Sequence, residues 1–188
     1  MAMNYSYLIN ETAEDRSWLK EAAVILGASI IIALFAPISI HLPFSPIPIA
    51  TQLQVILLLS CYLGSKRGAL AVLTYLFQGA IGLPVFAGGG AGVLVLAGPT
   101  GGYLLGYVIS AFITGFLMER MTNRTSSKAF AAMGLGTLIV YLFGVPWLSS
   151  YVGWQGAFIL GMLPFLIGDA LKVLVATRSL KSLRYFNS

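Results

Sequence analysis

Residues 22–65 read AAVILGASIIIALFAPISIHLPFSPIPIATQLQVILLLSCYLGS and contain no charged side chain. An α-helix needs about 20 apolar residues to cross the hydrocarbon core of a bilayer, so this stretch holds two spans and their connection. Pro37 and Pro48 bound the connection, because proline interrupts helices and favours turns. The stretch therefore predicts a helical hairpin embedded in a membrane.

The rest of the chain repeats this pattern. Residues 68–118 also lack charged side chains, and residues 129–177 carry only Asp169 and Lys172. Each stretch is long enough for two spans, and segments rich in glycine or serine mark the turns within them. We therefore expect an all-α membrane protein built as a bundle of six transmembrane helices. The expected helices are residues 19–37, 49–64, 67–82, 101–120, 129–149 and 157–183.

The start of the last helix has a second interpretation. Pro164 is compatible with the first turn of a helix, and residues 153–163 would then form an interfacial or re-entrant piece. Residues 1–18 mix acidic and basic side chains and do not resemble a cleaved signal peptide. They are expected to form a cytoplasmic lead-in to a transmembrane domain at residues 19–188.

The basic residues predict the orientation in the membrane. They fall between the hairpins and at the chain ends, while the three connections within the hairpins contain no Lys or Arg. Basic residues mark the cytoplasmic face, so both termini are expected inside the cell. The basic residues concerned are Arg16, Lys20, Lys66, Arg67, Arg120, Arg124, Lys128, Arg178, Lys181 and Arg184.

The composition excludes several functional classes. The chain is 58% hydrophobic and 9% charged with a mean hydropathy of +0.88, whereas soluble domains carry about 25% charged residues. The net charge of +5 is distributed between apolar runs, so we expect no nucleic-acid partner. A single cysteine, Cys61, leaves no intramolecular disulfide or Cys-based metal site, and no cofactor is expected. There is no phosphate-binding loop, so ATP hydrolysis would need other proteins.

Two ionisable residues lie inside the last apolar stretch. Asp169 and Lys172 are three positions apart and therefore share one face of a helix. Such residues are costly in a bilayer unless they are paired or face a wet cavity. One interpretation is that the two only neutralise each other, or that Lys172 reaches toward the cytoplasmic interface. The other is a ligand site, in which the lysine meets a carboxylate and the aspartate accepts hydrogen bonds from N–H groups.

Other polar and flexible segments give weaker signals. Gln52, Gln54 and Gln78 are long polar side chains within the spans, where an amide more often bonds another helix than a ligand. Residues 82–102 are rich in glycine and are compatible with a mobile lid or an ordinary flexible loop. His41 has no second imidazole with which to build a metal site and is expected to be a solvated loop residue.

Four segments together resemble the BioY family, the biotin-specific substrate-binding components of energy-coupling factor transporters. They lie in the expected outer connections and the last helix. They are Ser39-Ile-His-Leu-Pro-Phe-Ser-Pro-Ile-Pro48 with Gln52, Gly79-Ala-Ile-Gly-Leu-Pro-Val-Phe-Ala-Gly-Gly89, Gly98-Pro-Thr-Gly-Gly-Tyr-Leu-Leu-Gly106, and Leu163-Pro-Phe-Leu-Ile-Gly-Asp-Ala-Leu-Lys172.

The resemblance implies a biotin pocket toward the outer side of a six-helix bundle in the cell (inner) membrane. It also implies partners, namely a transmembrane coupling protein and two ATPase subunits. The residues that it assigns to the site are Asp169, Lys172, Gln52, Tyr103, Phe86 and Gly88, and Gln78 is added as a candidate for an amide that the family pattern could require. His41 departs from the family pattern, because a less polar residue, often proline, is expected there. The spans also lack asparagine, so a glutamine would have to supply any amide.

These observations favour a transporter subunit that captures biotin, with Asp169 accepting ureido N–H groups and Lys172 meeting the carboxylate or another polar group. A rival hypothesis is a stand-alone secondary carrier for a small organic acid or another vitamin, in which Asp169 relays protons. An intramembrane enzyme is disfavoured, because no nucleophile and base can be paired from these residues.

Overall fold

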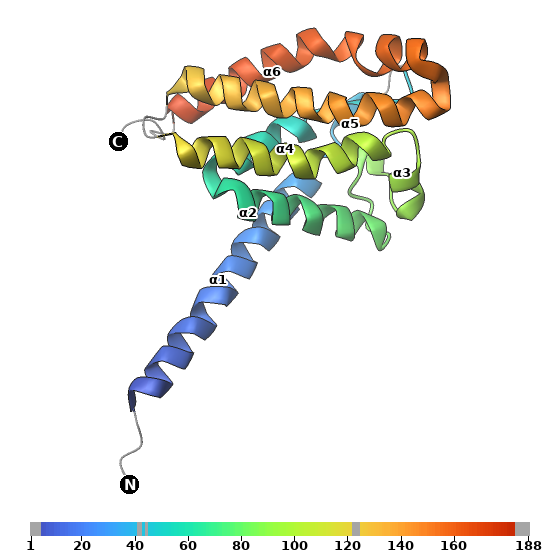
Figure 1. Ribbon diagram of the computed structural model, residues 1–188. Coiled ribbons are helices and arrows are strands. Elements are labelled where there is room, and N and C mark those ends of the chain that lie inside the picture. The colour runs from blue at the N-terminus through green and yellow to red at the C-terminus, as the bar shows by residue number, and fades with distance from the viewer. Residues whose placement is uncertain (1–4, 41–42, 44, 122–124, 183–188) are drawn as a thin grey trace.

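The computed structural model describes residues 5–40, 43, 45–121 and 125–182, which form a bundle of long helices (Figure 1). Its elements are α1 (Tyr5–Phe35), β1 (Ser39–Ile40), β2 (Ile49–Ala50), α2 (Gln52–Ala80), the 3-10 turn η1 (Ala87–Gly89), α3 (Val93–Ala97), α4 (Gly101–Arg120), α5 (Ser126–Gly161) and α6 (Leu163–Ser182). Within the described part of the chain, four stretches are long and apolar enough to cross a membrane. They are Trp18–Phe35, Gln52–Ala80, Gly101–Arg120 and Ser126–Arg178.

Helix α2 is broken at Gly64. The backbone there has φ of +83°, a conformation that glycine adopts without a steric penalty and that an L-residue resists. The two halves then pack on one another, since a Cβ atom at Gly68 would lie 3.1 Å from the Cα atom of Ser60. The helices expected at residues 49–64 and 67–82 correspond to these two halves.

The C-terminal helices differ from the first expectation. Helix α5 continues through residues 150–156 to Gly161, with a break at Gly153 where φ is +73°. The expected start of the last helix at residue 157 is therefore wrong, because α6 begins at Leu163. The alternative interpretation of Pro164 is confirmed: it lies in the first turn, where a missing N–H removes no helical hydrogen bond.

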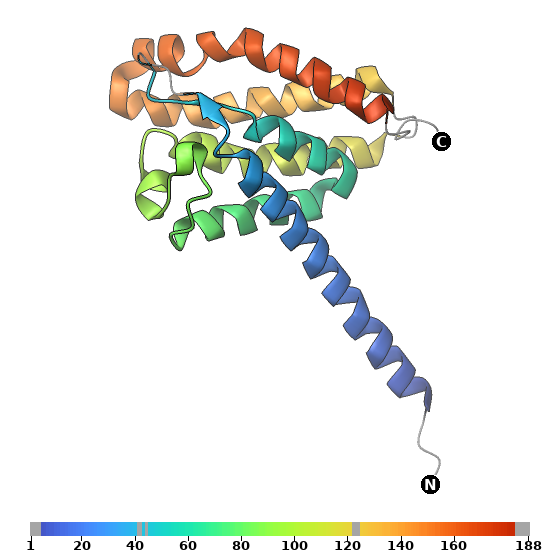
Figure 2. The same cartoon turned by 180° about the vertical axis from the view of Figure 1, so that it is seen from behind.

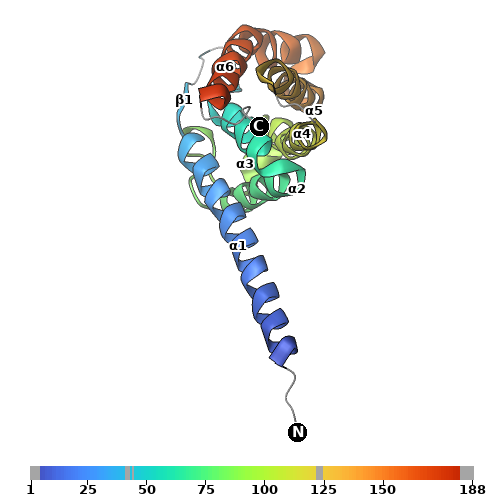
Figure 3. The same cartoon turned by 90° about the vertical axis from the view of Figure 1, so that its left-hand side faces the viewer.

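Helix α1 begins at Tyr5, well before the expected residue 19. Residues 5–18, which were assigned to the lead-in, are part of the same continuous helix. Its N-terminal part projects away from the bundle, and only its C-terminal part lies against α2 (Figures 1 and 3). An ion pair between Glu21 of α1 and Arg67 of α2 joins the two helices where they meet.

Helix α4 lies between α2 and α5 and packs against both (Figure 3). Small residues allow these helices to approach closely, as in other membrane bundles. A Cβ atom at Gly115 would lie 2.5 Å from the backbone of Ser65, and one at Gly136 would lie 2.9 Å from Ser110. The Glu119 carboxylate of α4 also accepts hydrogen bonds from the N–H and hydroxyl groups of Ser65, each at 2.8 Å.

Two connections, one between α1 and α2 and one between α2 and α4, form the end of the bundle that holds α3. Strands β1 and β2 pair antiparallel in the connection between α1 and α2, with Ser39 opposite Ala50 (Figure 2). His41 lies outside the described residues. Elements η1 and α3 fill the connection between α2 and α4. The break of α2, the end of α4, the start of α5 and the end of α6 all lie at the opposite end of the bundle (Figure 1).

Candidate functional site

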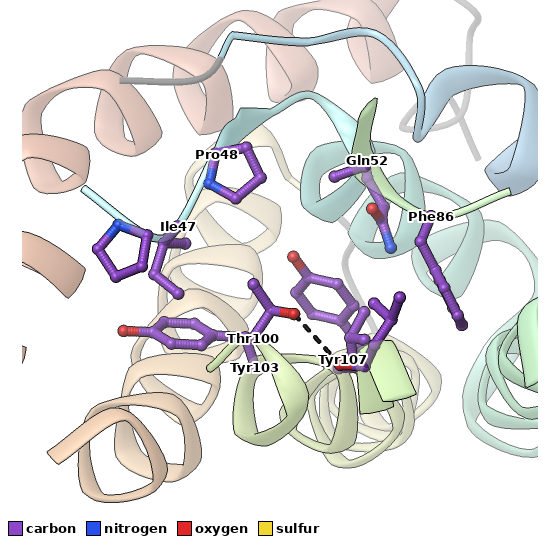
Figure 4. Close-up of a pocket in the computed structure, with 11 residues that line it drawn as sticks. Ile47, Pro48, Gln52, Phe86, Thr100, Tyr103 and Tyr107 are labelled. Atoms are coloured by element: carbon purple, nitrogen blue, oxygen red, sulfur yellow. Dashed lines mark hydrogen bonds between the residues drawn. The ribbon is translucent and has the colours of Figure 1, made fainter. Parts of the chain in front are cut away.

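Two adjoining cavities lie beneath the connections at the α3 end of the bundle. The larger has a volume of about 160 Å³ and the smaller about 40 Å³. Four residues line both cavities: Ile47, Pro48, Tyr103 and Tyr107. Figure 4 shows these residues around the larger cavity, with the two tyrosines coming from α4. The two spaces are therefore neighbouring compartments of one site.

Gln52 and Phe86 form one wall of the larger cavity (Figure 4). The Gln52 amide donates a hydrogen bond to the Tyr75 hydroxyl at 2.9 Å, and Tyr75 in turn donates to the carbonyl of Val85 at 3.1 Å. The Phe86 ring meets the Tyr75 ring edge to face, with 5.7 Å between the ring centroids. It also lies directly on Gly79, where a side chain would overlap it. These contacts hold the wall rigid.

Asp169 and Lys172 of α6 line the smaller cavity. Their charged atoms lie 3.5 Å apart, so the pair makes the ion contact that its spacing of three residues allows. The Asp169 carboxylate also accepts a hydrogen bond from the Tyr141 hydroxyl at 2.5 Å and one from the Gln54 amide at 3.3 Å. The acid is thus contacted from α2, α5 and α6, and a cavity adjoins it.

Tyr103 separates the two compartments. Tyr103 is 5% exposed, and its hydroxyl donates a hydrogen bond to the carbonyl of Gly161 at 2.9 Å. This bond ties α4 to the junction between α5 and α6. The ring packs against Gly144, where an added side chain would overlap it. These contacts hold the ring in the lining that the two compartments share.

The structure brings most of the predicted site residues together. The lining of one or both cavities includes Gln52, Phe86, Tyr103, Asp169 and Lys172. Gln78 lies elsewhere, and its amide donates to the hydroxyl of Ser29 on α1 at 3.1 Å. Gly88 lies in η1 with φ of +67°, next to the cavity-lining Ala87 but not in either lining. The role of all seven residues as ligand contacts remains a prediction.

Sequence reasoning overlooked three polar residues of the site. Thr100 and Tyr107 line the larger cavity, and Tyr141 lines the smaller one. Tyr107 follows Tyr103 by four positions, so the shared helix face was a usable signal. Tyr141 had no such signal, because only the packing of α5 against α6 brings it to Asp169.

A helical membrane protein with a cavity beside a buried acid and a partly buried amine belongs to the class of membrane proteins that bind a small solute. The BioY family model matches residues 8–187, and the chain therefore belongs to the BioY family.

Relatives and a solved structure agree with this assignment. The chain is 41% identical over 160 residues to the biotin transporter BioY of Rhizobium etli, covering 80% of this chain and 85% of that protein. It is 42% identical over 138 residues to the biotin transporter BioY of Thermotoga maritima, covering 73% and 80%. Its fold matches the crystal structure of the S-component for biotin from an ECF-type ABC transporter with a TM-score of 0.80. That match has 27% identity and covers 90% of this chain and 93% of that one.

Proposed function

We propose that this chain is the S-component of an ECF-type transporter and captures biotin in the two adjoining cavities. Membership of the BioY family supports the substrate, and the match to an S-component for biotin supports the role. The observation that carries the proposal is the pair of the buried Asp169 and the partly buried Lys172 beside a cavity. The chain is thus a binding and transport subunit.

The shape and chemistry of the cavities suit biotin. Biotin has a polar ureido ring at one end and a carboxylate at the other, separated by an apolar sulfur ring and alkyl chain. The site likewise has polar groups in both compartments, with Gln52 and Thr100 in the larger and Asp169 and Lys172 in the smaller. Apolar and aromatic groups shared by the compartments lie between them. Asp169 is assigned to the ureido N–H donors, because a buried carboxylate is a strong acceptor.

The membrane arrangement proposed here has six spans with both termini in the cytoplasm. The break at Gly64 divides α2 into two segments, which together with α1, α4, α5 and α6 give six, and residues 1–18 precede the first span. Basic residues flank the bundle end that holds the α2 break, and basic residues mark the cytoplasmic face. The cavities at the α3 end would then open toward the outside of the cell membrane.

The proposed partners are a transmembrane coupling protein and two ATPase subunits. An ECF-type ABC transporter needs ATPase activity, and this sequence has no phosphate-binding loop of its own. The rival carrier hypothesis makes a different forecast for vesicles that contain only this chain. Biotin uptake there that requires a proton gradient would favour the carrier. Uptake that requires added coupling protein, ATPases and ATP would support the proposal.

Equilibrium titration of the purified chain with biotin tests the site. Asp169→Ala and Lys172→Ala each remove a charged group that lines the smaller cavity, so the dissociation constant should rise about a hundredfold. Lys66→Ala removes an exposed basic residue from the α2 turn and should leave affinity unchanged. Thermal unfolding of each variant in detergent checks that it is folded. Wild-type affinity in both cavity variants would overturn the site assignment.

A further inference from the structure

The Asp169 carboxylate is held from both of its oxygens by two residues that the BioY resemblance did not assign to the site. Tyr141 donates to Oδ2 at 2.5 Å, and Gln54 donates to Oδ1 at 3.3 Å. Lys172 lies 3.5 Å from Oδ1, beyond the about 2.7–2.9 Å typical of a charge-assisted hydrogen bond. The Tyr141 hydroxyl is therefore the closest of the three contacts, and Gln54 adds a hydrogen bond to the other carboxylate oxygen.

Gln54 has an unusual environment for a residue that serves only folding. The residue is 4% exposed, and its Oε1 atom is buried with no hydrogen-bond partner in the described part of the chain. Turning the amide over would place that oxygen against the Asp169 carboxylate, so the present orientation is the favourable one. A buried acceptor without a partner destabilises the fold. The amide is thus retained at a cost to stability, for the contact that its N–H group makes with Asp169.

We propose that Gln54 and Tyr141 are positioning residues that hold the Asp169 carboxylate in the orientation in which it receives the N–H groups of the substrate. This inference rests on the proposed binding of biotin at Asp169. Tyr141 touches the smaller cavity from α5, and Gln54 acts from the first half of α2. The position of one acceptor on α6 therefore depends on three helices.

The Gln54→Leu variant distinguishes a role of Gln54 in positioning Asp169 from a role in packing alone. Leucine removes the N–H donor and also the unpartnered oxygen, so affinity for biotin should fall about tenfold or more while the melting temperature stays the same or rises. A purely structural glutamine would give the opposite result, with lower stability and unchanged affinity. That outcome would overturn the proposal for Gln54.

Tyr141→Phe tests the second positioning residue while it retains the ring. The dissociation constant should rise about tenfold or more, because a hydrogen bond to a charged acceptor is lost. The same change made together with Asp169→Asn should have a smaller effect than in the wild type, since Tyr141 acts through the carboxylate. Thr137→Val removes a buried hydroxyl one turn away that bonds its own helix, and it should leave affinity unchanged.

The outcomes distinguish this inference from the proposed function. If wild-type protein fails to bind biotin, the proposed function itself is wrong. If it binds and only Asp169→Asn weakens binding, while Gln54→Leu and Tyr141→Phe bind as wild type, the positioning proposal alone is wrong. Fully additive losses in the double variant would also contradict it.

Discussion

Tyr103 influences binding through its place between the compartments and through the space that Gly144 leaves for its ring. An alanine at Gly144 would push the ring out of position, because small-to-large changes in a packed core cost about 1–3 kcal/mol. We expect Gly144→Ala to lower the melting temperature and to weaken biotin binding. Thermal unfolding in detergent and a biotin titration measure the two effects.

Gly134→Ala is the matched control on the same helix. A Cβ atom there meets nothing within 4 Å, so the change should be neutral or stabilise α5 by about 0.5–1 kcal/mol through helix propensity. Equal losses of affinity in both variants would contradict the account, because the effect would then follow from helix composition and not from the Tyr103 ring.

Some candidate site residues can be predicted from the sequence because their residue types are rare in an apolar stretch. A carboxylate and an amine in an apolar stretch cannot be ignored, and so Asp169 and Lys172 were found without a structure. Glutamines are ambiguous, because an amide within a span can serve a ligand although it more often bonds another helix. The structure separates them: Gln52 lines a cavity, Gln54 bonds Asp169, and Gln78 bonds Ser29. The different partners of the three glutamines depend on tertiary packing and could not be predicted from the sequence.

Among the elements, the break of α2 depends on Gly64. Its backbone conformation is restricted to glycine, and a side chain there would overlap the Glu119 carboxylate that caps the second half of the helix. Gly64→Ala should therefore destabilise the protein by about 1–3 kcal/mol, measured by thermal unfolding in detergent. Unchanged stability would show that the second half of α2 does not need this turn.

Two hydrogen bonds from α5 hold the end of α3 and the residue that follows it. The Trp147 indole donates to the carbonyl of Gly98 at 2.9 Å, and the Tyr151 hydroxyl donates to the carbonyl of Ala97. Val95 and Thr100, which flank this segment, line the larger cavity. Trp147→Phe removes one bond worth about 0.5–1.5 kcal/mol, so bound biotin should dissociate several-fold faster.

The matched control for Trp147→Phe is Trp154→Phe, which changes an exposed ring farther along α5. Dissociation rates measured by stopped-flow or by radioligand exchange should be unaffected in that variant. If both tryptophan variants release biotin at the wild-type rate, the segment around α3 does not control exit from the site.

Element boundaries were predicted best where charge and glycine coincide. The start of α4 at Gly101 and its end at Arg120 agree with the expected helix at residues 101–120. The boundary between α5 and α6 was misplaced because glycine and serine were read as a loop at residues 149–156. The helix is instead interrupted only at Gly153, and the residues on both sides of it are helical. Composition indicates that the helix is interrupted but does not give the number of residues in the interruption.

At the scale of the whole molecule, the distribution of basic residues predicts the orientation in the bilayer. Single cysteines placed in a Cys61→Ser background report it, because Ser127 and Ala91 are exposed at opposite ends of the bundle. A membrane-impermeant maleimide added to intact cells should label Ala91→Cys at once. Ser127→Cys should react only after the membrane is permeabilised. The reverse pattern would contradict the proposed orientation.

The central claim is that biotin occupies the two compartments and contacts Asp169 and Lys172. A structure of the purified chain determined with biotin bound tests it most directly. The account predicts ligand density that spans both cavities around Tyr103, with ligand N–H groups within hydrogen-bonding distance of the Asp169 carboxylate. Ligand density elsewhere on the molecule, with Asp169 and Lys172 contacting only protein groups, would contradict it.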